Sequence, residues 1–339
     1  MAGHTPYNSA AAVKFIAIVV GSTALLTLLY RLDYEKIVSM NQTVGDSSKN
    51  NSMYSCSPMS TCGKLKKFFK ESWNSTNLIK PKAAVYILSR ASDANDLKKT
   101  LKELETNFLS KFSYPVIIFY EKDFVPHIPA MKSLTKLNIF FQEVQYEMPE
   151  YVSPPANEAF ECVGHNQRYR HMSRFHSKTV YELPLMLELE YYLRLEAHSH
   201  IRKPVTYDLF KNMKDKGLLY LYPCFGEDTP SCVNFLWDAV KNFVAVKRIK
   251  PHFFSEMTGT RMFNNSFEMA RMDLFTAKSY QNYINYIDQL GGIYHNQWGD
   301  APIKSLGVSI FVPKSKTKRI SDVTYYYRNV LLKEENCTR

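Results

Sequence analysis

The sequence predicts an α/β fold in which a Rossmann-like mixed sheet is flanked by helices. Residues 83–88 form a short apolar, partly β-branched run bounded by polar residues, which is typical of a buried strand. Leucines then recur at helical spacing from Leu97 onward, and residues 114–120 form a second apolar run. A strand, a helix and a strand in this order indicate a parallel βαβ unit, and such sheets bind ligands at the carboxyl ends of their strands.

The N-terminal part of the 339-residue chain predicts a membrane anchor. Residues 15–30 are apolar and lie between Lys14 and Arg31. As a helix with a rise of about 1.5 Å per residue they would cover roughly 24 Å, which suits the thinner membranes of the early secretory pathway. A cleaved signal peptide has an apolar region of similar length, but the bulky residues after the run offer no small-residue cleavage site. We therefore expect a cytosolic tail over residues 1–14 and an uncleaved anchor over residues 15–31.

The cysteines and glycosylation sequons indicate that the rest of the chain lies in an oxidising lumen. All six cysteines follow the apolar run, and an even number suits disulfide formation in the secretory pathway. We expect a solvated stem over residues 32–80, where an Asn- and Ser-rich sequence lacks hydrophobic periodicity, and one globular domain over residues 81–339. Five N-x-[ST] sequons occur, at Asn41, Asn50, Asn74, Asn264 and Asn336.

Spacing also suggests a disulfide pattern. Two pairs of cysteines lie close together in the sequence, and one of them spans a segment with proline and glycine that can close on itself. Six cysteines allow about fifteen pairings, and local pairing favours one of these. The expected bridges are Cys224–Cys232, Cys56–Cys62 and, from the remaining two residues, Cys162–Cys337.

The net charge of +11 raises the question of a nucleic-acid partner. The basic residues are scattered, apart from a short cluster between Lys64 and Lys70, and the sequence has no zinc-ligand spacing, P-loop or RNP motif. We therefore expect no nucleic acid. A nucleoside-diphosphate ligand or an anionic membrane surface accounts for the charge at least as well.

Two segments carry the most specific chemistry: residues 169–175 (Tyr-Arg-His-Met-Ser-Arg-Phe) and residues 298–302 (Trp-Gly-Asp-Ala-Pro). The first places the guanidinium groups of Arg170 and Arg174 beside an imidazole and aromatic rings, which suits the recognition of a phosphate-linked sugar. The alternative is that both arginines pair with acids in the core. Arg90, directly after the first strand, either meets a nucleotide or is a solvated loop residue.

A carboxylate ends a third strand-like element, since Glu196 follows the apolar and aromatic run of residues 188–195. This run and the segments 169–175 and 298–302 resemble signature segments of the fungal Golgi α-1,2-mannosyltransferases, glycosyltransferase family 15. The resemblance extends over residues 83–327. It implies a GT-A-like glycosyltransferase fold and retaining transfer of mannose from GDP-mannose to a mannoside on a glycoprotein or glycolipid glycan. It also implies a single-pass type II protein of the Golgi or early secretory membrane with a luminal catalytic domain.

The resemblance assigns roles to individual residues. Glu196 matches the family's manganese ligand, and Glu268, within residues 266–275, matches the acid proposed as the catalytic nucleophile. Tyr169 and Asp300 match residues that contact the donor or the acceptor. The full expected set is Glu268 for catalysis; Arg90, Tyr169, Arg170, Arg174, Asp300, Lys304 and Arg328 for substrate binding; and Glu196 with His198 for Mn²⁺.

Several positions depart from the family pattern. The aspartate of its metal motif is His198 here, the histidine that follows Gly-Asp-Ala-Pro-Val is Lys304, and its late histidine, a second metal ligand, aligns with Arg328. His198 or His200 could complete a manganese site with Glu196. Equally, Arg328 or Lys304 could supply the positive charge that the leaving diphosphate needs. The lost metal-site residues keep a second hypothesis open, a catalytically degenerate relative that binds mannan or a nucleotide.

Overall fold

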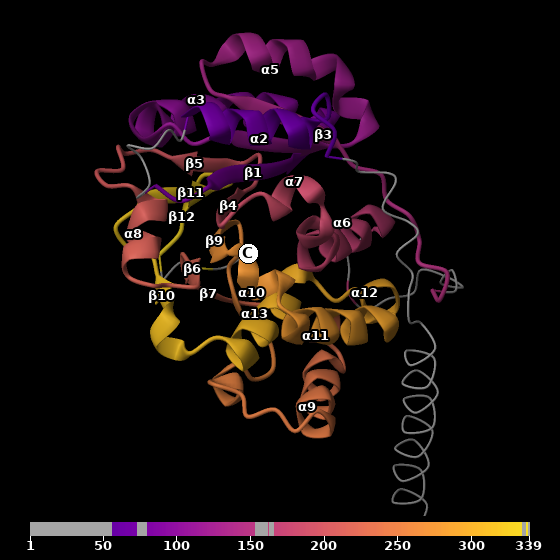
Figure 1. Cartoon of the computed structure of the whole chain (residues 1–339). Helices are drawn as coiled ribbons and strands as arrows, with labels where there is room; N and C mark the ends of the chain where they lie inside the picture. The colour runs from indigo at the N-terminus through magenta and orange to yellow at the C-terminus, as the bar shows by residue number, and fades with distance from the viewer. Residues whose placement is uncertain (1–55, 73–79, 153–161, 163–165, 334–336, 338–339) are drawn as a thin grey trace, which may run out of the picture. The chain divides into compact units, whose positions relative to one another are not determined.

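The computed structural model describes residues 56–72, 80–152, 162, 166–333 and 337 (Figure 1). These residues belong to one compact unit, Ser55–Arg339. The predicted cytosolic tail and membrane anchor lie outside the described residues. In the part of the chain that the structure describes, no helix is both long and apolar enough to span a bilayer.

A mixed sheet of seven strands forms the centre of this unit, as the sequence predicts. The strands, in chain order, are β1 (Ala83–Ser89), β2 (Val116–Tyr120), β3 (Ile139–Glu143), β4 (Tyr191–Leu195), β6 (Tyr220–Tyr222), β9 (Phe267–Arg271) and β10 (Thr317–Arg319). Their order across the sheet is β10-β6-β9-β4-β1-β2-β3. Strand β9 runs antiparallel to both of its neighbours, and all the other pairs are parallel. The carboxyl ends of β1, β4, β6 and β10 therefore lie along one edge.

Helices cover both faces of the sheet, with α3 (Ala94–Leu104) and α5 (Ile128–Leu134) on one side and α6 (Gln167–Ser177), α11 (Lys278–Gln289) and α13 (Asp300–Phe311) on the other (Figure 1). The remaining helices are α2 (Thr61–Ser72), α4 (Ser110–Phe112), α7 (Pro184–Leu187), α8 (Leu209–Asp215), α9 (Leu236–Val246), α10 (Met272–Thr276) and α12 (Gly292–His295). Two smaller antiparallel sheets complete the fold, β12-β11-β5 and β7-β8. Their strands are β5 (Ser199–Ile201), β7 (Phe225–Glu227), β8 (Arg261–Phe263), β11 (Tyr325–Tyr327) and β12 (Val330–Leu331).

The alternation of side chains along β1 explains how the sheet joins two cores. Val85 and Ile87 belong to the same buried cluster as Leu97 of α3. Tyr86, between them, points to the opposite face. There its ring lies 5.9 Å from the imidazole of His176 on α6. The predicted βαβ unit is therefore present as β1, α3 and β2, with the leucine face of α3 buried as expected.

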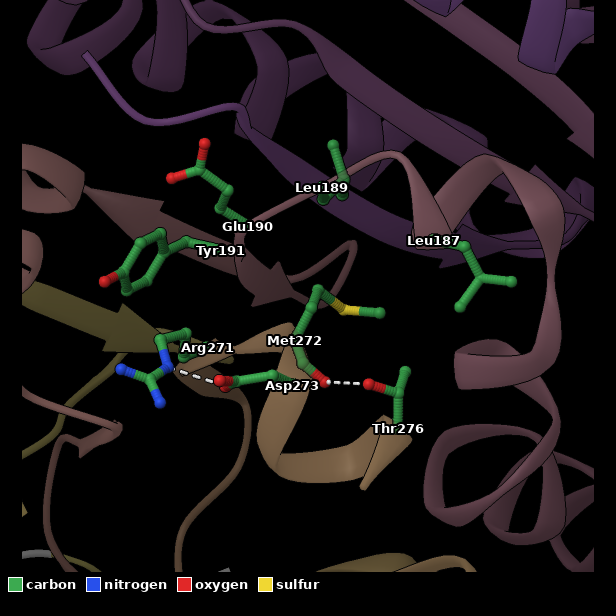
Figure 2. Close-up of a pocket in the computed structure, with 8 residues that line it drawn as sticks. All are labelled: Leu187, Leu189, Glu190, Tyr191, Arg271, Met272, Asp273 and Thr276. Atoms are coloured by element: carbon green, nitrogen blue, oxygen red, sulfur yellow. Dashed lines mark hydrogen bonds and ion pairs between the residues drawn. The ribbon is translucent and has the colours of Figure 1, made fainter. Parts of the chain in front are cut away.

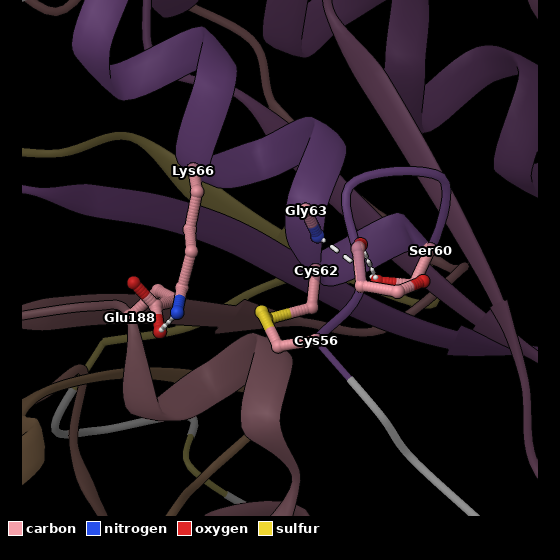
Figure 3. Close-up of a disulfide and its surroundings, with 7 residues drawn as sticks. Cys56, Ser60, Cys62, Gly63, Lys66 and Glu188 are labelled. Carbon is pink, nitrogen blue, oxygen red and sulfur yellow. Dashed lines mark hydrogen bonds and ion pairs between the residues drawn. A yellow bond between two sulfur atoms is a disulfide. The ribbon is translucent and has the colours of Figure 1, made fainter.

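The position of helix α2 shows that the predicted boundary between the stem and the globular domain was wrong. We expected a solvated stem up to residue 80, but Leu65 and Phe69 are buried. The Lys66 ammonium lies 3.0 Å from the carboxylate of Glu188, directly after α7 (Figure 3). The reason is the amphipathic spacing of these apolar residues, which gives α2 a face to bury. The folded unit therefore begins before the predicted residue 81.

All the described cysteines form disulfides, and two of the three predicted bridges were wrong. Cys56–Cys62 is confirmed and closes the turn that precedes α2 (Figure 3). Cys224 cannot close on Cys232 locally, because β7 follows Cys224 immediately and pairs with β8, which extends the chain between the two cysteines. The other two bridges are Cys162–Cys232 and Cys224–Cys337.

Removing the long-range bridge is expected to cost more stability than removing the local one. Cys224 and Cys337 are 113 positions apart, so replacing both by alanine is expected to lower the free energy of unfolding by about 2–4 kcal/mol. Cys56 and Cys62 are 6 positions apart, and their loss frees a much shorter loop. Urea denaturation of the two double variants measures both costs. A larger cost for the Cys56/Cys62 variant would contradict the prediction.

Candidate functional site

The site expected from the sequence lies at the carboxyl end of β4, where Glu196 follows the last residue of the strand. Glu196 accepts hydrogen bonds on both oxygens: from Arg194 Nη2 at 3.3 Å and from the Tyr327 hydroxyl at 2.6 Å. Arg194 is buried, and its Nη1 donates to Asp300, which begins α13. Asn265 donates to the same Asp300 oxygen at 2.7 Å. The arrangement links two predicted site residues, Glu196 and Asp300, through an arginine to which the sequence analysis gave no role.

A sequence signal for Arg194 existed. Residues i and i+2 of a strand share a face, so strand geometry predicts that Arg194 and Glu196 lie on the same side of β4 and its extension. Asp300 differs from its expected role. Its side chain is buried and holds Arg194, so it positions that guanidinium group and does not present a free carboxylate to an acceptor.

Glu268, the predicted nucleophile, lies inside the protein. It sits on β9 directly opposite Arg194 and has no exposed surface. Its carboxylate accepts hydrogen bonds from the hydroxyl groups of Tyr192 and of Tyr220, the latter at 2.9 Å, and forms an ion pair with Lys304. In this conformation Glu268 cannot contact a bound sugar. Its three protein partners satisfy both oxygens.

Lys304, predicted to meet the leaving diphosphate, is buried with Glu268 and does not reach a substrate. It lies on the inner face of α13, one turn after Asp300, and is fully enclosed. Burial lowers the pKa of the Lys304 ammonium to about 8, although the Glu268 carboxylate opposes that shift. Burying a charged ammonium is costly. The Glu268 carboxylate and the nearby rings of Tyr181 and Tyr192 stabilise the charge of Lys304.

The lowered pKa predicts a pH dependence of stability. The unfolded chain keeps the proton of Lys304 up to about pH 10.4. The folded chain loses it near pH 8. Between these values the unfolded state binds more protons, so the free energy of unfolding is expected to rise with pH. The difference in the free energy of unfolding between the natural protein and a Glu268→Gln/Lys304→Met variant isolates the contribution of Lys304, because both proteins contain the same buried tyrosines. A difference that stays constant from pH 8 to 10 would contradict the assignment.

Of the two arginines of α6 that were predicted to bind substrate, Arg174 has an acidic partner in the core. Arg174 forms a bidentate ion pair with Asp288 of α11, with N–O distances of 2.8 and 2.9 Å, and Lys178 adds a third contact at 2.8 Å. Burial raises the pKa of the Asp288 carboxyl, but these two cations outweigh it and leave that pKa below its usual value. Arg170 is buried as well. Arg174 therefore follows the alternative interpretation, an ion pair with a core acid, and its predicted substrate contact is corrected.

Tyr169 does lie beside the loop that contains Asp300. A Cβ placed on Gly299 would lie 2.8 Å from the Tyr169 hydroxyl and 3.6 Å from Asp228 Oδ2, so these three groups converge. The loop is held in place by Trp298, whose indole nitrogen donates to the carbonyl of Asn234 at 2.8 Å. Asp228 is a buried acid that the sequence analysis missed. It lies in a loop after β7 that carries no periodic pattern.

The predicted manganese ligands Glu196 and His198 contact different partners. His198 Nδ1 lies 3.2 Å from Asp96 of α3, and His200 Nδ1 lies 3.2 Å from Glu103 of the same helix. A turn after β4, closed by a hydrogen bond from Ser199 N to Glu196 O, turns the chain towards α3. Among the described residues, the one grouping of three candidate ligands is Cys56, Cys62 and Glu188, in which both sulfurs are oxidised to a disulfide.

Two predicted cations remain partly or fully exposed. Arg90 follows β1, and its Nε lies 3.7 Å from Asp93. Arg328 is exposed in the turn between β11 and β12 with φ of 48°. Its backbone N–H donates to the carbonyl of His198, and its guanidinium lies 5.3 Å from the ring centroid of Tyr327, whose hydroxyl binds Glu196. Of the two cations proposed to replace a metal ion, the structure thus leaves Arg328 accessible and encloses Lys304.

A cavity of about 490 Å³ opens at the other end of the sheet (Figure 2). Its walls include Tyr191, the first residue of β4, and Arg271, the last residue of β9. Arg271 is paired with Asp273 at 2.6 Å in this cavity. Because β4 carries Glu196 at its opposite end, the cavity is separate from the predicted site.

Comparisons with known proteins agree with this fold. The model of a family described as glycolipid 2-alpha-mannosyltransferase matches residues 33–338. Alpha-1,2 mannosyltransferase KTR1 of Saccharomyces cerevisiae is 28% identical over 269 residues, which cover 73% of this chain and 68% of that protein. Glycolipid 2-alpha-mannosyltransferase 2 of Candida albicans is also 28% identical, over 73% of this chain and 58% of its own length. The O-glycoside alpha-1,2-mannosyltransferase omh1 of Schizosaccharomyces pombe is 27% identical, over 72% of this chain and 68% of its length.

Two solved structures are similar over most of the chain. Core-mannan synthase A from Aspergillus fumigatus, in an Mn/GDP form, has a TM-score of 0.66 and 26% identity, and covers 76% of this chain and 78% of its own. The mannosyltransferase Ktr4p from S. cerevisiae, in complex with GDP, has a TM-score of 0.68 at 21% identity, covering 87% and 86%. The second likeness bears on the fold alone, and both agree with the predicted GT-A-like class.

Proposed function

The chain belongs to the glycolipid 2-alpha-mannosyltransferase family, glycosyltransferase family 15, and we propose that it is a retaining α-1,2-mannosyltransferase that uses GDP-mannose. The acceptor is a mannoside on a glycoprotein or glycolipid glycan. Two relatives that match most of the chain are named as α-1,2-mannosyltransferases, and a 26% identical structure was solved with GDP. The observation that carries the proposal is the linked group Glu196, Arg194 and Asp300 at the carboxyl edge of β4, where sheets of this type bind their ligands.

The burial of Glu268 favours a reaction without a covalent enzyme intermediate. The bond between the anomeric carbon and the diphosphate breaks, and the acceptor hydroxyl attacks from the same face and passes its proton to the departing diphosphate. Retention of configuration follows from same-face attack. Glu196 is the predicted acid whose side chain keeps 30% of its surface exposed, so its carboxylate is the one available to stabilise positive charge on the sugar. Tyr169 and the Gly299 loop border the acceptor side.

The described residues do not fit a resident manganese ion. Mn²⁺ favours several oxygen ligands, often with imidazole. Of the three predicted acids only Glu196 is not buried, and its carboxylate already accepts hydrogen bonds from Arg194 and Tyr327. The predicted second ligand, His198, is paired with Asp96. We therefore propose no step through a metal ion, and Arg328 provides positive charge beside Glu196.

We further propose that the protein is a type II membrane protein of the Golgi or early secretory pathway, anchored by residues 15–31 with residues 1–14 in the cytosol. The support is that the described cysteines are all paired, which suits an oxidising lumen. A tag placed after Arg339 is expected to resist protease in sealed microsomes and to be digested after detergent is added. Digestion without detergent would contradict this topology.

Purified full-length protein in detergent, incubated with GDP-mannose and methyl α-mannoside, tests the activity. The expected product is a dimannoside that an α-1,2-specific mannosidase cleaves. The enclosed Glu268–Lys304 pair favours one second candidate, a degenerate relative that binds the nucleotide without transfer. Saturable GDP binding without a dimannoside, over a range of natural mannoside acceptors, would support that candidate and reject the transferase.

A further inference from the structure

A second hollow, of about 450 Å³, lies at the carboxyl ends of β6 and β10. Five separate parts of the chain line it: the turn after β5, the end of β6, the segment after β10, strand β11 and the segment from β12 onward. The lining includes Lys203, Arg319, Ile320, Tyr326, Leu332 and Lys333. Its volume is within the range of small-ligand pockets.

The charge of this hollow has one sign. Lys203, Arg319 and Lys333 line it, and no Asp or Glu occurs among the described lining residues. Neither of the two lysines forms an ion pair with any described residue. Asp322 belongs to the same segment, but its carboxylate accepts a hydrogen bond from Tyr207 at 2.7 Å and lines a neighbouring hollow. Two lysines that line one hollow and have no acidic partner among the described residues favour an anionic ligand there.

The floor of the hollow suits a sugar ring. Ile320, Val323 and Leu332 are nearly buried and apolar, and the ring of Tyr326 adds an aromatic wall. Arg202 fixes that ring, because its guanidinium lies 4.2 Å from the ring centroid. Aromatic and apolar surface packs against the C–H face of a pyranose, and hydroxyl groups at the rim serve its polar groups.

The hollow is separate from the donor site. Tyr327 and Tyr326 are neighbours on β11, and residues next to each other on a strand point to opposite faces. Tyr327 points to Glu196, whereas Tyr326 lines the hollow. We propose that this hollow binds a sugar that carries a phosphate group, as a second glycan site on the far face of β11. The binding itself does not depend on the transfer reaction.

Calorimetric titration of the full-length protein in detergent tests the site with mannose 6-phosphate as the probe. Binding is expected, and a Lys203→Ala/Lys333→Ala variant is expected to bind at least about tenfold more weakly, since it loses two charge-assisted contacts. The matched control is Lys247→Ala/Lys250→Ala, which removes two exposed lysines from the end of α9 and is expected to leave the affinity unchanged. Equal weakening in both variants would reject a specific site.

Further probes separate the two parts of the ligand. Mannose and inorganic phosphate are each expected to bind more weakly than mannose 6-phosphate, and Tyr326→Ala is expected to weaken mannose 6-phosphate but not inorganic phosphate. Inorganic phosphate that binds as tightly as the sugar phosphate would overturn the sugar assignment. Vesicles with phosphatidylinositol phosphate give the remaining arm. If the two hollow lysines were needed for vesicle binding but not for mannose 6-phosphate, the ligand would be a lipid headgroup and the proposal would fail.

Discussion

Replacing Glu268 with glutamine is expected to lower the free energy of unfolding by about 3–5 kcal/mol. Glu268 and Lys304 form an ion pair in which neither side chain has exposed surface. Glutamine keeps the shape of the side chain but removes its charge, so the buried ammonium of Lys304 loses its counter-charge. Breaking one partner of a buried pair is costly for this reason, whereas the intact pair itself contributes little. Urea denaturation at pH 7 measures the loss.

A double variant provides the internal control. Glu268→Gln/Lys304→Met removes both charges with similar volumes, so it is expected to recover most of the stability that the single variant loses. Glu256 and Lys314 form a matched exposed pair at 2.5 Å, and Glu256→Gln is expected to change the stability by less than about 1 kcal/mol. A Glu268→Gln variant as stable as the Glu256→Gln variant would show that the buried pair is not what stabilises this part of the sheet.

The double variant also decides the chemistry. If Glu268 were a nucleophile, its loss would abolish transfer whether or not Lys304 was charged. Because Glu268 is enclosed by Tyr192, Tyr220 and Lys304, we expect the stable double variant to retain at least about a tenth of the natural kcat. A tenfold loss would correspond to a rise in the activation free energy of about 1.4 kcal/mol. The sequence analysis alone predicted the opposite, since the resemblance assigned catalysis to this residue.

The features that the sequence predicted correctly are local ones. The leucine spacing of α3 reports which face of that helix is buried, and the apolar runs of β1 and β2 are too short and too β-branched to be other than strands. Strand order could be inferred in part, because a βαβ unit allows few arrangements. None of these signals depends on a residue far away in the sequence.

The partners of the site residues could not be predicted in the same way. Arg174 pairs with Asp288, 114 positions away, and Glu196 accepts from Tyr327, 131 positions away. The pattern around Arg174 describes an arginine on a helix, and the same pattern fits a ligand contact or a core ion pair equally well. Which one forms depends on the packing of α6 against α11. Charged side chains that meet only through tertiary packing therefore have no local signature.

The last prediction concerns the positive charge at the leaving diphosphate. Arg328 is exposed next to Tyr327, whose hydroxyl donates to Glu196, and it aligns with a metal-binding histidine of the family. Replacing Arg328 with asparagine, which tolerates the left-handed backbone at φ of 48°, is expected to lower kcat by about 10²–10³-fold at saturating GDP-mannose. The charge matters most when the diphosphate departs, so KM is expected to change much less.

Arg248 offers a matched control, because it is also an exposed arginine with a left-handed backbone, at φ of 52°. Arg248→Asn is expected to leave kcat unchanged, and Arg328→Lys to restore part of the rate by returning the charge.

EDTA is expected to lower the rate of the natural protein by less than about tenfold, since one carboxylate with both oxygens already bonded makes a poor site for a hard divalent ion. Calorimetric titration of the GDP-loaded protein with Mn²⁺ then distinguishes the two sources of charge. Micromolar affinity that Glu196→Ala removed, together with an unaffected Arg328→Asn variant, would place a metal ion at this site and exclude the arginine from that role.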